Sequence, residues 1–104
     1  MFRSDQVAET LREFSGAAQA LRLPSAPSKP IFVHEEHDQP QPRLDVESGG
    51  GMMVHVGRVR KCSVLDRKFV ILGHNIIRGA AGAALLNAEL LVARFLYAPG
   101  QMEL

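Results

Sequence analysis

The chain has 104 residues, which suits one small domain or part of a larger one. Its formal charge is +1, from 12 basic and 11 acidic residues, and this balance gives no argument for binding nucleic acid or an anionic membrane. The single cysteine, Cys62, excludes an internal disulfide framework, and the early polar residues argue against a secretory signal peptide, so we expect a cytoplasmic protein.

Apolar residues recur at spacings of four and three near the N-terminus, and this period predicts an amphipathic helix over residues 4–21. Ser4 is expected to cap the helix, and Asp5 suits the positive end of the helix dipole. Gly16 interrupts the pattern and is expected to end the helix early.

Prolines forbid a regular helix in the next segment, LPSAPSKP, at residues 23–30. Residues 31–33 then predict a short strand. The segment 34–51, HEEHDQPQPRLDVESGGG, is polar and rich in proline and glycine, which indicates a long loop. Ordered loops of this length are uncommon unless they carry function or wrap another surface.

Two valine-rich segments, 52–59 and 68–72, predict an antiparallel hairpin with a wide connection. Strand alternation predicts two faces for the first segment. One face holds Val54, Val56 and Arg58, and the other holds Met53, His55, Gly57 and Val59. Because a lone hairpin is marginal in water, we expect its first strand to find a partner on the other edge, for example from a second copy of the chain.

Residues 75–97 have the spacing of a long helix, which Pro99 and Gly100 are expected to stop. Asn87 and Glu89 interrupt its apolar run, which is too short and too polar to span a bilayer. The helix is apolar around most of its circumference, so it needs cover on several sides. We expect exposed apolar side chains, with a patch near Leu86, Leu90 and Leu96, among Ile76, Ile77, Leu85, Leu86, Leu90, Leu91, Val92, Phe95 and Leu96.

The element order is therefore helix, strand, long loop, β-hairpin and long terminal helix, which is typical of an α+β fold. The hairpin and the first helix offer too little surface to cover the last helix. The pattern thus indicates part of a larger structure.

Several groups of residues suggest chemistry. The segment His34-Glu35-Glu36-His37-Asp38 contains metal-ligand types, but the prolines and the strand beside it argue against the helix that would align its histidines. We therefore predict no metal site.

Cys62 follows two cations that would lower its thiol pKa, yet it lies in the hairpin connection and is expected to be structural.

Two further groups have a functional and a structural interpretation. The spacing of Gly79 and Gly82 fits neither a P-loop nor a dinucleotide fingerprint, so a close-packed helix start is favoured. Arginines in the loop and in the hairpin suit either a substrate phosphate or ion pairs at an interface, and we favour the ion pairs. These arginines are Arg43, Arg58 and Arg60.

Three stretches together resemble a known family: 23–45, 51–75 and 76–91. They contain LPSAP, then QPQPRLD, then a GMMVHVGR strand, then HNIIRGAAG. In this order the motifs are similar to the closing portion of fungal and archaeal aspartate-semialdehyde dehydrogenases. Two departures are Gln39, where the family usually has arginine, and Gly73, where it often has serine.

The resemblance implies a glyceraldehyde-3-phosphate-dehydrogenase-like C-terminal dimerisation domain, present in part. Residues 1–74 would belong to that domain, and residues 75–104 would form the helix that packs back on the NADP-binding domain. The family reduces L-aspartyl 4-phosphate with NADPH through a cysteine thioester, with a histidine as acid and base. The resemblance also implies Asn75, Arg78 and Gly79 as neighbours of the nicotinamide end of NADP.

The family's cysteine, histidine and dinucleotide motifs are not in this sequence. We therefore expect no turnover from the chain alone and predict no catalytic residue in it. The expected partner is protein: a second copy, or a polypeptide that carries the missing N-terminal half. The alternative is a non-catalytic dimerisation or interaction module.

Overall fold

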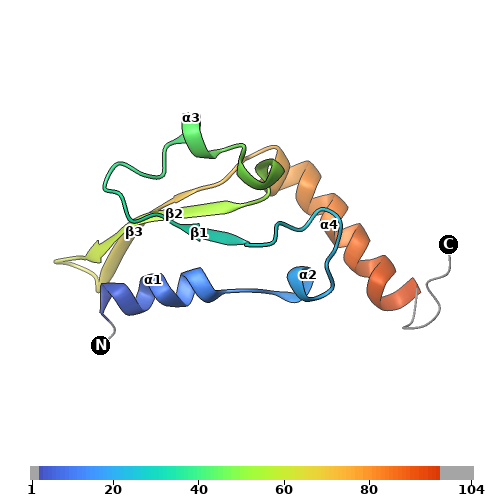
Figure 1. The fold of residues 1–104 in the computed structure, drawn as a ribbon, viewed down its shortest axis with the longest axis horizontal. Coiled ribbons are helices and arrows are strands. Elements are labelled where there is room, and N and C mark those ends of the chain that lie inside the picture. The colour runs from blue at the N-terminus through green and yellow to red at the C-terminus, as the bar shows by residue number, and fades with distance from the viewer. Residues whose placement is uncertain (1–2, 97–104) are drawn as a thin grey trace.

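The computed structural model describes residues 3–96 and consists of one mixed sheet with helices around it (Figure 1). The strands lie in the order β1–β2–β3. Helix α1 runs along one side of the sheet, the loop with α3 lies on the other, and α4 leads away from the end of the sheet. The elements are α1 Ser4–Glu13, α2 Ala17–Ala20, β1 Ile31–Val33, α3 Pro42–Asp45, a 3-10 turn Ser48–Gly51, β2 Val54–Lys61, β3 Arg67–Leu72, a π-helical turn Ile77–Ala81, α4 Gly82–Leu91 and a second π-helical turn Val92–Leu96.

The first predicted helix is divided in two, because α1 ends at Glu13 and α2 begins after Gly16. The early end at the glycine is thus confirmed. The predicted cap is wrong by one residue: Ser4 is the first helical residue, and Arg3 precedes the helix. The reason is the Gln6 side chain, which reaches back to accept a hydrogen bond from the Arg3 backbone N–H at 2.8 Å.

The hairpin prediction is confirmed, since β2 and β3 pair antiparallel. The expected partner on the other edge of β2 is present over Val54–Val56, but it is β1 of the same chain and not a second copy. There β1 pairs with β2 in parallel, and Phe32 lies opposite His55. Parallel neighbours need a long crossover connection. The loop from His34 to Met53 provides it, which gives this long loop a structural role.

A β-bulge interrupts β2 after Gly57. Gly57 pairs with Val70 and Arg60 with Lys68, so β2 has one residue more than β3 in this interval. Arg58 takes up the irregularity with a φ of 57°. The alternation predicted through Val59 therefore ends at Gly57.

The core of the described chain is small. Its buried apolar side chains are Leu23, Val33, Met52 and Val56. Val33 and Val56 are register partners in the sheet that α1 packs against. Asp45 and His55 are also buried, so polar groups form an unusual share of the interior.

Helix α4 approaches the core through a glycine. A Cβ atom on Gly82 would overlap the Met52 sulfur and would lie 2.6 Å from the Ile77 carbonyl oxygen. The expected close packing at the glycine-rich helix start is thus confirmed at Gly82. The Glu89 side chain links α4 to the segment before β1. Its carboxylate accepts one hydrogen bond from the Ser25 backbone N–H, at 2.8 Å, and one from the Ser25 hydroxyl, at 2.6 Å.

The terminal helix exposes apolar surface, as predicted. Of the nine side chains named above, none of the eight that the structure describes is buried. The predicted position of the patch is wrong for Leu86 and Leu90, which are half-buried, whereas Leu85 and Leu91 are exposed. The side chain of Leu96 and the predicted stop at Pro99 and Gly100 lie outside the described residues. The most exposed members are Ile76 at 68%, Leu85 at 55%, Leu91 at 52% and Phe95 at 74%.

Within residues 3–96, no helix is long and apolar enough to cross a membrane.

Candidate functional site

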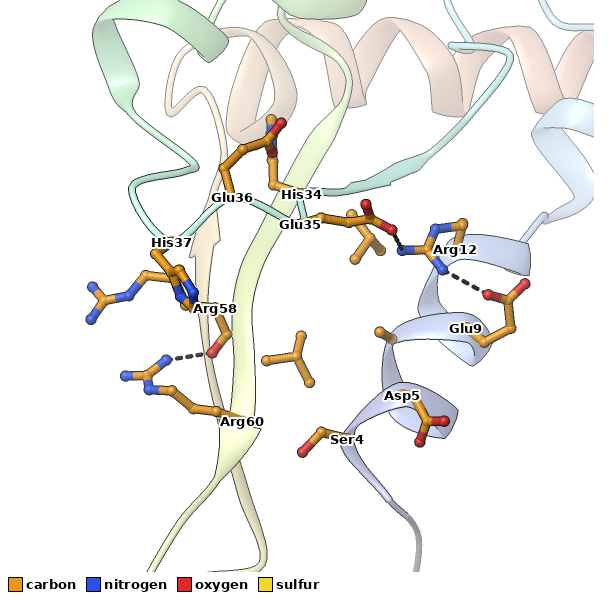
Figure 2. Close-up of a pocket in the computed structure, with 13 residues that line it drawn as sticks. Ser4, Asp5, Glu9, Arg12, His34, Glu35, Glu36, His37, Arg58 and Arg60 are labelled. Carbon is orange, nitrogen blue, oxygen red and sulfur yellow. Dashed lines mark hydrogen bonds and ion pairs between the residues drawn. The ribbon is translucent and has the colours of Figure 1, made fainter.

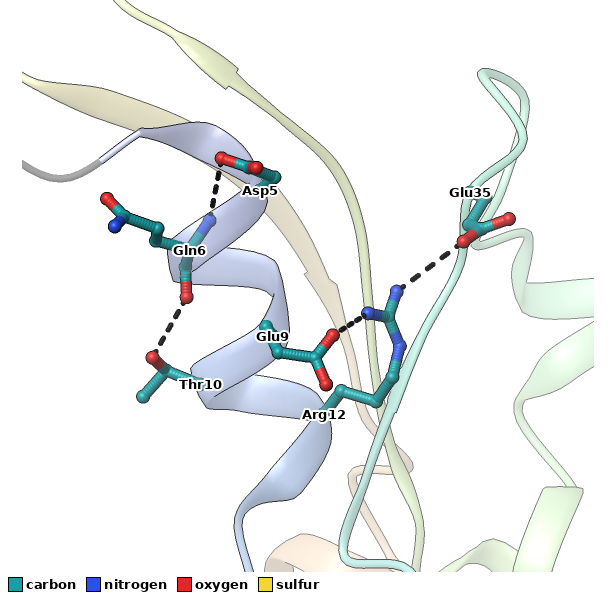
Figure 3. Close-up of polar contacts among 6 residues, drawn as sticks. All are labelled: Asp5, Gln6, Glu9, Thr10, Arg12 and Glu35. Atoms are coloured by element: carbon teal, nitrogen blue, oxygen red, sulfur yellow. Dashed lines mark hydrogen bonds and ion pairs between the residues drawn. The ribbon is translucent and has the colours of Figure 1, made fainter.

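A charged cavity of about 470 Å³ lies between α1 and the end of β1 (Figure 2). On the α1 side of the cavity, Arg12 forms ion pairs with Glu9 at 2.6 Å and with Glu35 at 3.8 Å (Figure 3). The second ion pair connects α1 to the loop after β1. Arg58 and Arg60 line the opposite side, and the Arg60 guanidinium donates to the Arg58 carbonyl oxygen.

The three arginines singled out in the sequence do not all lie at this cavity. Arg58 and Arg60 share this cavity, whereas Arg43 lies on α3 and does not line it. Within the described residues, none of these three arginines forms an ion pair. Their expected role at an interface stays a prediction.

The residues expected beside NADP lie where β3 leads into the terminal helix. Asn75 and Gly79 are exposed, and Arg78 is half-buried. In the described part of the chain, the side chains of Asn75 and Arg78 make no hydrogen bond or ion pair. Gly79 is not crowded, since a Cβ atom there would make an ordinary van der Waals contact with the His74 carbonyl oxygen, at 3.7 Å. These groups are thus free to contact a ligand.

His74 organises this helix start. Its Nδ1 accepts hydrogen bonds from the backbone N–H groups of Ile76 at 3.2 Å and Ile77 at 3.0 Å. A π-helical bond from Gly79 N–H to the His74 carbonyl oxygen, at 3.0 Å, closes the first turn. The imidazole thus satisfies two of the orphan donors of the helix. Sequence reasoning assigned this histidine no role.

Cys62 lies in the connection between β2 and β3, whereas Asn75 follows the other end of β3. Hydrogen bonds from the backbone N–H groups of Leu65 and Val64 lower the pKa of the thiol. Strand β3 separates the two regions, and its six residues span about 20 Å. Cys62 therefore lies far from the residues expected beside NADP, and its expected structural role stays a prediction.

The loop face of the sheet brings together three polar side chains from three segments. His34 follows β1, His55 lies in β2 and Asp45 ends α3. The His34 Nε2 and the His55 Nδ1 are 2.9 Å apart, and the two rings are stacked. The Asp45 Oδ1 lies 3.9 Å from the His34 Nε2.

All three side chains of this His34–Asp45–His55 cluster are largely shielded from solvent. His55 is 3% exposed and Asp45 is 9% exposed. Burial lowers the pKa of His55 from its ordinary value of about 6.5, and the Asp45 carboxylate opposes this shift only in part. The ring is therefore neutral at pH 7. Its Nε2 is buried and has no hydrogen-bond partner in the described structure.

Sequence reasoning missed this cluster because it considered the histidines by local spacing. His34 was grouped with His37, which is exposed and is not among the three side chains that meet. His34 and His55 are 21 residues apart and meet only because β1 pairs with β2 in parallel. The alternation of side chains in each strand indicates which residues share a face. It does not indicate which residue of β1 lies opposite which residue of β2.

Comparison with known proteins identifies the family of the chain. The sequence model described as semialdehyde dehydrogenase, dimerisation domain, matches residues 2–78. The aspartate-semialdehyde dehydrogenase of Methanothermobacter thermautotrophicus is 48% identical over 92 residues, which are 86% of this chain and 26% of that protein. The same-named protein of Candida albicans is 49% identical over 90 residues, which are 86% of this chain and 25% of that protein.

The fold agrees with the sequence match. A crystal structure of aspartate-semialdehyde dehydrogenase with NADP from Candida albicans superposes with a TM-score of 0.77 and 48% identity, over 88% of this chain and 25% of that chain. The α+β fold and the resemblance to a dimerisation domain are thus confirmed. The chain spans about a quarter of the length of these relatives. On both the sequence match and the fold, it belongs to the semialdehyde dehydrogenase dimerisation-domain family.

Proposed function

We propose that this chain supplies the dimerisation-domain part of a cytoplasmic, NADP-dependent aspartate-semialdehyde dehydrogenase. That enzyme would reduce L-aspartyl 4-phosphate to aspartate semialdehyde in amino-acid biosynthesis. The observation that carries the proposal is the combined likeness to the Candida albicans structure, at 48% identity and a TM-score of 0.77. Identity at this level over most of the chain supports a shared role as well as a shared fold.

In this proposal the chain has two parts. Residues 1–74 form part of the dimerisation domain, and residues 75–104 return to an NADP-binding domain that another polypeptide segment provides. The exposed apolar side chains Leu91 and Phe95 support this division, because a packed neighbour would remove them from water.

The helix start offers groups that fit one end of NADP. Asn75 presents an exposed amide, which can both donate to and accept from a carboxamide or a ribose hydroxyl. Arg78 adds positive charge, and Gly79 leaves room for close approach. When bound in its reduced form, NADPH, the cofactor would supply the hydride for the reduction. The contribution of these residues is to hold and orient its nicotinamide end.

A chimeric enzyme tests the proposed role of Asn75. The segment of the Candida albicans enzyme that matches this chain would be replaced by the chain itself. We expect Asn75→Ala to raise the KM for NADP by about tenfold, since a lost hydrogen bond of about 1 kcal/mol or more approaches a factor of ten. Steady-state kinetics with varied NADP measure the change.

Asn87→Ala is the matched control, because Asn87 is an exposed asparagine on α4 itself. It should leave the KM for NADP unchanged. Equal KM values for the two variants would remove Asn75 from the cofactor site.

A non-catalytic dimerisation module is the second candidate. The observation that favours it is the position of Cys62, the single cysteine, which the length of β3 separates from Asn75 and the helix start. Such a module would associate with a full-length enzyme through the same apolar surface of α4.

A further inference from the structure

The His34–Asp45–His55 cluster has no role in the function proposed above, yet it occupies a large part of a small interior. We propose that these three side chains bind a divalent first-row transition metal ion of the zinc type, with water as the fourth ligand. The site would join β1, β2 and α3 at the loop face of the sheet.

The ligand set and the spacing both suit such an ion. Two imidazoles and one carboxylate are the ligands of several zinc sites that keep one position for water. Tetrahedral coordination with bonds of about 2.0–2.1 Å separates the ligand atoms by about 3.3 Å. Here the ligand atoms lie within 4.8 Å of one another, and two of the separations are 2.9 and 3.9 Å. These two separations lie within about 0.6 Å of the tetrahedral value, and the third would have to shorten by at most about 1.5 Å.

The surrounding backbone holds the ligands in place. The Gln41 backbone N–H donates to the Asp45 Oδ2 at 2.7 Å, which leaves the Oδ1 facing the His34 ring. The His34 backbone N–H donates to the Val56 carbonyl oxygen at 2.8 Å and so fixes the residue against β2. A hydrogen bond to a ligating carboxylate, such as the one from Gln41, orients the ligand in metal sites.

The charge balance also points to a cation. Asp45 is buried, and within the described residues no lysine or arginine pairs with its carboxylate; its nearest basic group is His34. A buried carboxylate is costly unless a positive charge or several hydrogen bonds compensate it. A divalent ion would supply that charge.

The geometry leaves room for the fourth ligand. A cavity of about 220 Å³ borders the three side chains and is also lined by Phe32, Ser48 and Met53. It exceeds the space that one water molecule needs, so an ion can enter with a water attached.

The test uses the full 104-residue chain, freed of metal with a chelator and then titrated with Zn²⁺ against a chromophoric chelator. We expect one equivalent to bind. Asp45→Asn and His34→Gln should each weaken the affinity by more than about tenfold, because each removes a direct ligand. Added Zn²⁺ should raise the melting temperature of the unmodified chain more than that of Asp45→Asn.

His37→Gln is the matched control: it removes an exposed histidine three residues from His34 that is outside the cluster. It should bind Zn²⁺ as tightly as the unmodified chain, and Co²⁺ should give both the same ligand-field spectrum. Failure of the unmodified chain to bind one equivalent of Zn²⁺ would overturn the proposal, and the two imidazoles would then share only a hydrogen bond. An equal loss of Zn²⁺ affinity in His37→Gln and His34→Gln would also overturn it. Because Asp45→Asn is nearly isosteric, its folding can be verified by circular dichroism before titration.

Discussion

Gly57→Ala should strongly destabilise the fold, although it adds a single methyl group. A Cβ atom on Gly57 would overlap the Gln39 carbonyl oxygen and would lie 2.6 Å from the Pro40 Cδ. The obstacle is largely main chain, which cannot move aside as a flexible side chain would. We expect a cost of about 3 kcal/mol, at the upper end for overpacking. This cost is a large part of the net stability of a typical domain, which is about 5–15 kcal/mol.

Gly73→Ala provides the control for Gly57→Ala. It makes the same chemical change at an exposed glycine whose Cβ would have no atom within 4 Å. Urea denaturation followed by circular dichroism measures the difference in free energy of unfolding. Equal urea midpoints for the two variants would show that Gln39 and Pro40 do not pack closely against β2 at Gly57.

The double substitution Leu91→Gln and Phe95→Gln should dissociate the purified chain without unfolding it. These side chains are 52% and 74% exposed and lie one helical turn apart on the open face of the terminal helix. We expect the unmodified chain to self-associate through this face at micromolar concentration. Covering each side chain contributes about 1 kcal/mol or more, so losing both should weaken association by ten- to a hundredfold.

Val64→Gln with Leu65→Gln is the control for that effect. Both residues are more exposed still, at 87% and 73%, but they lie in the hairpin connection and not on the helix. Light scattering after size-exclusion chromatography, over a range of concentrations, measures the molar mass. A well-folded monomer of the unmodified chain at every concentration would contradict the prediction.

Local patterns predicted the elements well. The period of the first segment located α1, its glycine located the break, and the valine-rich segments located the hairpin. The apolar circumference of the last helix predicted its exposed surface. These features depend on neighbours within one or two turns, so sequence alone carries them.

Features that depend on distant segments were missed. The parallel pairing of β1 with β2 depends on the path of the long loop, which no local period encodes. The bulge at Arg58 ended an alternation that looked regular in the sequence. For the same reason His34 was grouped with its sequence neighbour His37 instead of with His55. The cap by His74 was missed because sequence reasoning sought a role for Asn75 beside it.

The dehydrogenase activity of the chimeric enzyme tests the central claim most directly, that this chain is the working dimerisation-domain part of an aspartate-semialdehyde dehydrogenase. The chimera would be assayed for NADPH formation from NADP, phosphate and aspartate semialdehyde. We predict NADPH formation within about tenfold of the parent rate, since a misplacement of a few tenths of an ångström costs less than the hundredfold loss expected for about 1 Å. A chimera that is folded and has the parent's oligomeric state, yet forms no NADPH, would contradict the account.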